Sequence, residues 1–277
     1  MTLAARHQAF FDLHQSGCFV IPNPWDRGSA RMMAAAGARA LATSSAAHAF
    51  TLGRPDMGGI SRDEALAHAQ DLLFATALPL SGDFENGFAD DPEGVAETVR
   101  LAAEVGLSGC SIEDTRMVAG APAYDFDLAV ERIRAAVAAA KALGRPFVLC
   151  ARADGVMNGV YDLAEGIRRL QAFEAAGADL LYLPVPPGPG ELRQVLASVT
   201  KPVNALAAGP LRKLRVAEFA SMGVRRISLG SQVARVTHAA IRDCMEAMMG
   251  AGSFDPLMAA ASGDEVDALL RKGTGDE

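Results

Sequence analysis

Three carboxylates of this chain stand at the ends of short β-type runs, where they could hold a metal ion. Asp83 is the last residue of the run that begins at Leu80, and Glu85 follows two residues later. Glu113 is the last residue of the run 110–113. Converging carboxylates repel one another unless a cation lies between them, and an all-oxygen ligand set suits Mg2+ or Mn2+. No His or Cys lies beside them, which argues against zinc or copper. Helix capping is the alternative role, but Asp83 and Glu85 precede a glycine-containing loop, so we predict a Mg2+ site, with Mn2+ as a second choice.

Further groups that could bind a small molecule stand in or directly after other runs of the same type. They are the segment 44–48 (SSAAH), Arg152 and Asn204. A guanidinium matches a planar carboxylate as a two-pronged hydrogen-bond partner, so Arg152 favours a small acidic substrate. Trp25, the only tryptophan, follows the first run, and it either walls a substrate pocket or packs at the rim of the fold.

Eight β-type runs would have to position these side chains. Each follows a glycine or a proline, and alanine-rich segments of helical periodicity, such as 128–143 and 163–176, lie between them. Glycine fits the left-handed position that ends a helix, and proline is tolerated at the first residue of a strand. The runs are residues 18–21, 40–43, 80–83, 110–113, 147–150, 180–183, 203–206 and 226–229.

Strands that alternate with helices imply an α/β fold with a parallel sheet. Eight such units close most simply into a (β/α)8 TIM-type barrel, in which residues just after the strands gather on one face. A doubly wound open sheet is the alternative, although no GxGxxG follows the first run. No linker divides the chain, so we predict one domain over residues 1–277 with extra helices in residues 231–277.

Composition and charge narrow the classes of partner. The chain has 277 residues, 50% apolar and 21% charged, and its net charge is −7. These values are typical of a globular protein and exclude a disordered or collagen-like chain. Without a basic block, they argue against nucleic acid and anionic membranes as partners. Four dispersed cysteines, with no signal-peptide or membrane-spanning stretch, predict a cytoplasmic protein with reduced thiols.

Seven segments, in order along the chain, resemble the isocitrate lyase/phosphoenolpyruvate mutase superfamily from about residue 18 to about residue 235. They are 23–26 (NPWD), 43–45 (TSS), 52–56 (LGRPD), 83–88 (DFENGF), 111–114 (SIED), 152–154 (RAD) and 202–204 (PVN). The resemblance implies a barrel whose substrate is a 2-oxo or 2-hydroxy acid that chelates Mg2+. It also implies that Asp83 binds the metal directly, while Glu85 and Glu113 hold its waters.

The same resemblance implies roles in substrate binding and catalysis. Ser44 and the backbone amides near Ser45 and Ala46 would take the substrate carboxylate. Arg152 would neutralise its charge, and Asp56 would lie over the reacting carbon. We therefore expect Asp56, Arg152 and Ser44 to be catalytic. The expected substrate-binding set is Trp25, Ser44, Ser45, Ala46, Arg152 and Asn204.

The loop after the fourth run differs from that of the best-known relatives. Isocitrate and methylisocitrate lyases carry a KKCGH run there, whereas residues 115–122 read TRMVAGAP, and the loop lysine and strand-6 histidine of phosphoenolpyruvate mutase also have no equivalent. The enolate-stabilising groups remain. We therefore expect a Mg2+-dependent lyase that breaks a C–C bond in a small 2-oxo or 2-hydroxy di- or tricarboxylic acid. The alternatives are a phosphonopyruvate-type P–C mutase or hydrolase, and a barrel that binds a 2-oxo acid without converting it.

The segment after the eighth run is apolar beyond the needs of one barrel unit. Val233, Val236, Ile241, Met245 and Met248 are among its members, and breaks in it fall near 252–253 and 262–263. A monomer would leave part of this surface exposed. Relatives exchange such helices between two barrels, so we predict a homodimer or homotetramer held by residues 231–270.

Overall fold

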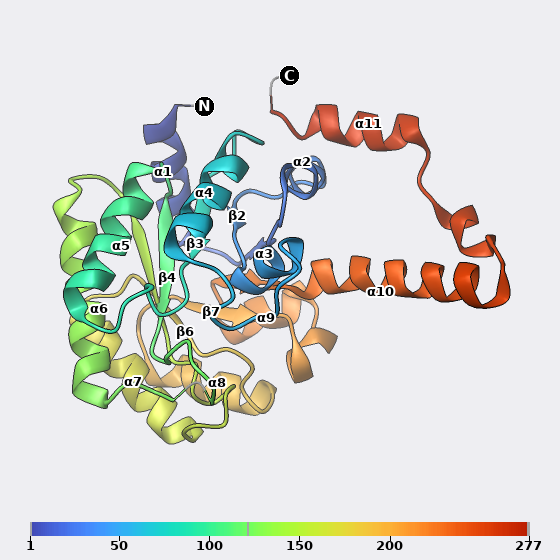
Figure 1. Cartoon of the computed structure of the whole chain (residues 1–277). Coiled ribbons are helices and arrows are strands. Elements are labelled where there is room, and N and C mark those ends of the chain that lie inside the picture. The colour runs from blue at the N-terminus through green and yellow to red at the C-terminus, as the bar shows by residue number, and fades with distance from the viewer. Residues whose placement is uncertain (1, 121, 276–277) are drawn as a thin grey trace.

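The computed structural model describes residues 2–120 and 122–275, and its centre is a barrel of eight parallel strands (Figure 1). The strands are β1 (Phe19–Ile21), β2 (Leu41–Ala42), β3 (Leu80–Asp83), β4 (Gly109–Glu113), β5 (Val148–Arg152), β6 (Leu180–Tyr182), β7 (Val203–Leu206) and β8 (Arg226–Ser228). The prediction of an α/β barrel with eight strands is confirmed, and strand boundaries differ from the predicted ones by a residue or two. The doubly wound alternative is excluded because β1 pairs with β8.

The sheet is hydrogen-bonded in the order β1-β8-β7-β6-β5-β4-β3-β2, so the seam of the barrel lies between β1 and β2. At this seam the backbone N–H of Ala42 donates to the carbonyl of Pro22 at 3.1 Å. The side chain of Asn23 strengthens the closure. Its Nδ2 donates to the Thr43 carbonyl at 2.9 Å, and its Oδ1 accepts from the backbone N–H of Leu229 and Gly230.

Helices follow the strands and cover the barrel from outside. They are α2 (Arg27–Ala35), α3 (Ser45–Thr51), α4 (Arg62–Leu73), α5 (Pro92–Glu104), α6 (Phe126–Ala142), α7 (Leu163–Ala176), α8 (Pro189–Ser198), η1 (Gly209–Lys213) and α9 (Val216–Met222). Their ends obey local chemistry. Asp26 caps α2, and Ser61 with Glu64 forms a capping box on α4. Gly177 and Gly223 end α7 and α9 in the left-handed conformation, as the glycine pattern predicts.

Apolar side chains fill the barrel and the layer around it. The helix α1 (Leu3–Leu13) closes the end of the barrel where the strands begin, and Phe10 is fully buried there against Phe19 and Val148. A larger cluster joins the sheet to α4, α5, α6 and α7, with Leu107 and Phe173 fully buried. This packing fixes the strands, so the opposite end of the barrel is free to carry polar groups.

The chain after β8 forms an arm that leaves the barrel. It contains α10 (Gln232–Glu246), η2 (Ala247–Ala251), η3 (Asp255–Ala259) and α11 (Gly263–Lys272). Figure 1 shows α10 projecting away from the barrel and α11 lying near α2, with which it is in contact. Ala234 is the one buried residue of α10, and α11 has none. Within the described residues, no helix is both long and apolar enough to cross a membrane.

Candidate active site

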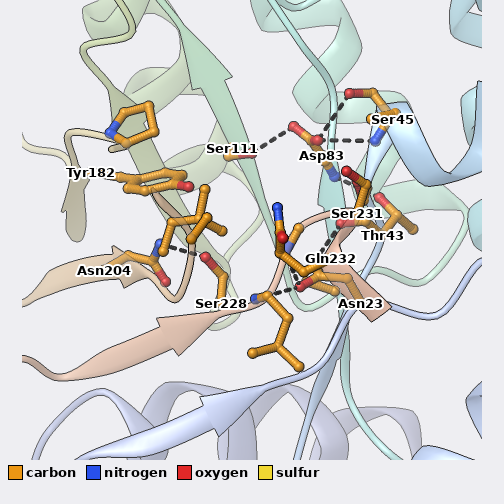
Figure 2. A pocket seen from close by; sticks show the side chains of 18 of the residues that line it. Asn23, Thr43, Ser45, Asp83, Ser111, Tyr182, Asn204, Ser228, Ser231 and Gln232 are labelled. Carbon is orange, nitrogen blue, oxygen red and sulfur yellow. Dashed lines mark hydrogen bonds between the residues drawn. The ribbon is translucent and has the colours of Figure 1, made fainter. Parts of the chain in front are cut away.

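A cavity of about 360 Å³ opens at the end of the barrel where the strands finish (Figure 2). Its wall combines residues at the ends of strands with residues of the loops that follow them. The structure brings seven of the sequence-predicted residues to this wall: Ser44, Ser45, Ala46, Asp56, Asp83, Arg152 and Asn204. Local sequence explains the arrangement, because Asp83 and Arg152 are the last residues of β3 and β5 and so lie at the mouth of the barrel.

The other three predicted residues lie outside the described wall of this cavity. Glu113 ends β4 and is buried directly beside Arg152, with which it is in register. Glu85 is also buried, and it borders a neighbouring cavity of about 670 Å³. Trp25 is half-buried. Its backbone N–H donates to Ser29 Oγ, and its carbonyl is 3.0 Å from His68 Nε2.

Asp83 is held by donors from the start of α3 and from the neighbouring strand β4. Its Oδ2 accepts from the backbone N–H and the hydroxyl of Ser45, at 3.0 and 3.1 Å, and its Oδ1 accepts from Ser111 Oγ at 3.2 Å (Figure 2). Its own backbone N–H donates to Thr43 Oγ1 at 2.7 Å. The carboxylate therefore has a fixed orientation at the mouth of the barrel. The Ser45 amide, expected to bind the substrate, binds Asp83 in this structure.

Arg152 is the cation at the centre of the acidic groups. Its guanidinium lies 2.7 Å from Asp83 Oδ1, 3.0 Å from Glu113 Oε2 and 2.6 Å from Asp154 Oδ2. Burial lowers the pKa of Arg152, but the charges of these carboxylates raise it by more, so the pKa lies well above its ordinary value. Arg152 therefore stays charged, and its nitrogens are directed by partners on three successive strands or strand ends.

Negative charge exceeds positive charge around Arg152. Burial raises the pKa of Glu85 to about 7, and the charges of Asp83 and Asp56 add to the effect. Burial, followed by the charge of Asp154, raises the pKa of Glu113 well above its ordinary value. Glu85 Oε2 is buried without a hydrogen-bond partner. A further cation would relieve these groups, so the donor chemistry fits a hard, oxygen-preferring ion.

The carboxylates are nevertheless not arranged as a ready-made cage. In the described part of the chain, no three His, Cys, Asp or Glu side chains converge closely enough to bind one ion together. A cation at this mouth would therefore have one or two direct protein ligands and complete its shell with water or substrate, which is the usual habit of Mg2+.

Asp56 and Ser44 occupy contrasting surroundings. Asp56 lies in an exposed stretch of the loop after α3, but protein atoms around its carboxyl group partly desolvate that group and raise its pKa. The Met57 N–H, which donates to Oδ1 at 2.8 Å, lowers this pKa, and the charge of Asp83 raises it. Ser44 Oγ accepts from the Ala47 N–H at 3.3 Å and so caps α3. Asp56 can therefore exchange a proton more readily than an ordinary aspartate, while the Ser44 hydroxyl has a structural partner.

Sequence reasoning missed residues that act through others at the site. Asp154 binds the Arg152 guanidinium, and its own N–H donates to Asp114 Oδ1 at 2.8 Å. Asp114 is in turn paired with Arg169 at 3.0 Å and accepts from Tyr161. The signal for Asp154 was its position two residues after Arg152, because residues two apart along an extended chain face the same side.

The loop after β4 lies beside the cavities and carries no Cys or His in its described residues. Thr115 and Ala123 form an isolated antiparallel bridge at its base, and Arg116 is ion-paired with Asp90 of the loop after β3. Val118, which lies in the sequence between Arg116 and Ala123, is exposed. The loop is thus fixed at its base, while Val118 faces solvent.

Known proteins are similar to this chain in sequence and in fold. The sequence profile described as phosphoenolpyruvate phosphomutase matches residues 10–249. An uncharacterised protein of Mycobacterium tuberculosis is 32% identical, over 80% of this chain and 82% of its own length. The oxaloacetate decarboxylase of Paraburkholderia xenovorans is 30% identical, over 84% of this chain and 79% of its own.

Solved structures agree with the sequence comparison. A Burkholderia cenocepacia protein, assigned only provisionally as a lyase/mutase, superposes with a TM-score of 0.91 at 45% identity, covering 96% of this chain and 95% of the other. The fold, the order of the motifs and the match over most of the chain lead to one conclusion: the chain belongs to the phosphoenolpyruvate phosphomutase family, within the isocitrate lyase/phosphoenolpyruvate mutase superfamily of lyases and mutases.

Proposed function

We propose that the protein is a Mg2+-dependent lyase that breaks a C–C bond in a small 2-oxo or 2-hydroxy di- or tricarboxylic acid. The observation that carries this proposal is the pairing of Asp83 with Arg152 in the mouth of the barrel, among more carboxylates than one guanidinium can neutralise. Asp83 would bind the metal, and Glu85 and Glu113 would hold its waters. When bound, Mg2+ polarises the 2-oxo oxygen and stabilises the negative charge of an enolate.

The chain's own residues would bind and orient the substrate. Arg152, fixed by Glu113 and Asp154, presents a charged donor beside Asp83, where a substrate carboxylate would replace part of its present pairing. Asp56, an exposed residue whose partly desolvated carboxyl group has a raised pKa, borders the same cavity and would hold or accept a proton next to the reacting carbon.

The names of relatives support C–C cleavage. Besides the oxaloacetate decarboxylase, a protein named probable 2-methylisocitrate lyase 2 from Corynebacterium glutamicum is 29% identical over 67% of this chain and 61% of its own length. A solved 2,3-dimethylmalate lyase has a TM-score of 0.83 at 27% identity, covering 98% of this chain and 95% of that one. All three names denote loss of a fragment from a di- or tricarboxylic acid. A cytoplasmic location is supported by the four cysteines, which are free thiols.

The test is turnover with Mg2+ of oxaloacetate, citramalate-type and isocitrate-type acids, with phosphonopyruvate followed by phosphorus NMR. We expect Asp83→Ala to lower kcat/KM at least about 1,000-fold, because the variant loses charge stabilisation of the enolate. Asp12→Ala, which removes an exposed aspartate from α1, should leave activity unchanged. Full Mg2+-dependent activity in Asp83→Ala would contradict the metal assignment. Turnover of phosphonopyruvate alone would replace C–C cleavage by P–C chemistry, and calorimetric binding of 2-oxoglutarate without any product would indicate a non-catalytic barrel.

A further inference from the structure

The cavity wall contains three arginines, and only one of them has an acidic partner among the described residues. Arg152 is paired with three carboxylates. Arg235 extends from the first turn of α10 and is exposed. Arg226 points inward from β8 and is 5% exposed, yet it also borders the cavity. Arg226 is thus a buried cation beside a cavity. None of the carboxylates in the described residues forms an ion pair with it.

Arg226 is held firmly by neutral groups. Its Nε donates to Asn204 Oδ1 at 2.8 Å, and the two residues are in register on β8 and β7. Asn204 Nδ2 donates to Ser228 Oγ at 2.9 Å, as Figure 2 shows. Both polar ends of the Asn204 side chain are therefore occupied. Asn204, which we expect to bind substrate and which borders the cavity, also fixes the position of the Arg226 guanidinium.

The surroundings of Arg226 leave its charge uncompensated. Its Nη1 is buried without a hydrogen-bond partner. Burial lowers the pKa of this guanidinium by more than its neighbours Cys150 and Tyr182 raise it, and the charge of Arg152 adds a smaller lowering effect. A buried charge without a counterion is strongly unfavourable, and a guanidinium remains protonated in proteins. An anion entering the cavity would offset this cost.

We propose that Arg226 binds the second carboxylate of the substrate, so that the site selects di- or tricarboxylic acids over monocarboxylic acids. This inference rests on the proposed function, which places the 2-oxo or 2-hydroxy end of the substrate at Asp83 and Arg152. Arg226 is one inward-facing position deeper in β8 than Ser228, and all these residues border the same cavity. A short diacid extending into the barrel would meet Arg226 with its far end.

Arg226 is better suited to this role than Arg235. A buried guanidinium held by Asn204 has already lost its rotamer freedom and its water, so its bond to a carboxylate loses little further entropy. Exposed Arg235 would have to be ordered and desolvated first. The two arginines therefore make different predictions for substitution.

The test compares L-malate and L-lactate, which share the 2-hydroxy acid end and differ in the second carboxylate. Their dissociation constants would be measured by calorimetry with Mg2+, for the full-length protein and for Arg226→Met, Arg235→Met and Arg225→Met. Arg225 is the matched control, because it precedes β8 and its side chain donates to the Gly17 carbonyl outside the cavity. We expect malate to bind the unmodified protein about 10- to 100-fold more tightly than lactate. Arg226→Met should abolish this preference without weakening lactate.

Each of the other outcomes would contradict the inference. If Arg226→Met weakens both acids equally, Arg226 is a structural residue and the inference is wrong. If Arg235→Met alone removes the preference, the second carboxylate binds at the mouth and the inference is again wrong. If lactate binds and malate binds no better, the inference fails while the proposed function stands. If neither acid binds the unmodified protein, the proposed function fails and the inference fails with it. Thermal unfolding checks that each variant is folded, because Arg226→Met removes a buried charge but also leaves the buried Asn204 Oδ1 without its donor.

Discussion

The mouth of the barrel and the C-terminal arm differ in which side chains they bury: the mouth buries charged groups, and the arm exposes apolar ones. At the mouth, charged groups are buried, and Arg152 finds its partners within the chain. In the arm, apolar groups are exposed: Val236 at 68% and Met249 at 78%. Burying charge is costly unless partners are arranged, whereas exposing a continuous apolar surface is costly unless something covers it. Most charged groups at the mouth thus have partners within the chain, whereas the exposed apolar residues of the arm have none among the described residues.

We propose that a second copy of the chain covers the arm. Ile241, Met245 and Met249 follow one another at intervals of four residues, so they form a stripe along α10 and its continuation. Within its own chain the arm is anchored at its far end, where Gly273 lies so close to Arg31 of α2 that a side chain could not fit. The stripe between these two ends is open to a partner.

The largest expected effect concerns the mouth. Arg152→Met leaves Asp83, Glu113 and Asp154 buried without their cation, and we expect it to lower the free energy of unfolding by about 3–5 kcal/mol in metal-free buffer. Urea denaturation measures the change. Arg168→Met is the control, because the Arg168–Glu165 pair lies at the surface, where solvent screens it, and should change stability far less. If the two substitutions lowered the free energy of unfolding equally, the claim that the buried charges at the mouth depend more on their partners than surface charges do would be wrong.

The second effect concerns the arm. The unmodified protein should have a light-scattering mass at least twice that of the 28.9 kDa chain at micromolar concentration. Ile241→Glu with Met249→Glu would put unpaired charge into the proposed interface, and we expect dissociation to become at least about 100-fold more favourable, about 3 kcal/mol. Phe74→Glu, at a residue that is 70% exposed on the end of α4, should not change the mass. A monomeric unmodified protein would show that the arm is tolerated without a partner.

The smallest effect concerns the closed end of the barrel. Burial lowers the pKa of His14 from 6.5 to about 3 in the folded chain, so the unfolded chain takes up a proton first as the pH falls. This contribution to stability is complete above pH 6.5 and is lost as the pH falls towards 3, by about 2 kcal/mol at pH 5. His14→Gln should make stability less dependent on pH between 6.5 and 4, as urea denaturation at several pH values would measure. An unchanged pH dependence in His14→Gln would mean that its imidazole is protonated in the folded protein.

The sequence predicted the eight strands because their boundaries depend on local chemistry. Glycine after a helix and proline before a strand act over a few residues, as Gly177 before β6 and Pro202 before β7 show. Asp83 and Arg152 were predicted at the site for a related reason. Both end strands, and the ends of parallel strands in a barrel necessarily meet.

Contacts between distant residues could not be read from the sequence in the same way. Arg225 and Arg226 are adjacent, and alternation places one inside the barrel and one outside without saying which. The register of β8 on β7 makes that choice by pairing Arg226 with Asn204. Likewise, composition indicated helices after residue 231, but their separation from the barrel depends on packing across the whole chain.

The seam between β1 and β2 makes the barrel unequally resistant to local opening. Ladders of backbone bonds join the other strand pairs, whereas here the Pro22–Ala42 bond and the Asn23 side chain carry the closure. Both sides of the seam, Ile21 and Thr43, border the cavity. Local opening of the barrel should therefore begin at the β1–β2 seam, beside the cavity. We expect the amide hydrogens of β2 to exchange with deuterium before those of β4. Earlier exchange in β2 would show that the weakest junction of the scaffold opens first, beside the cavity.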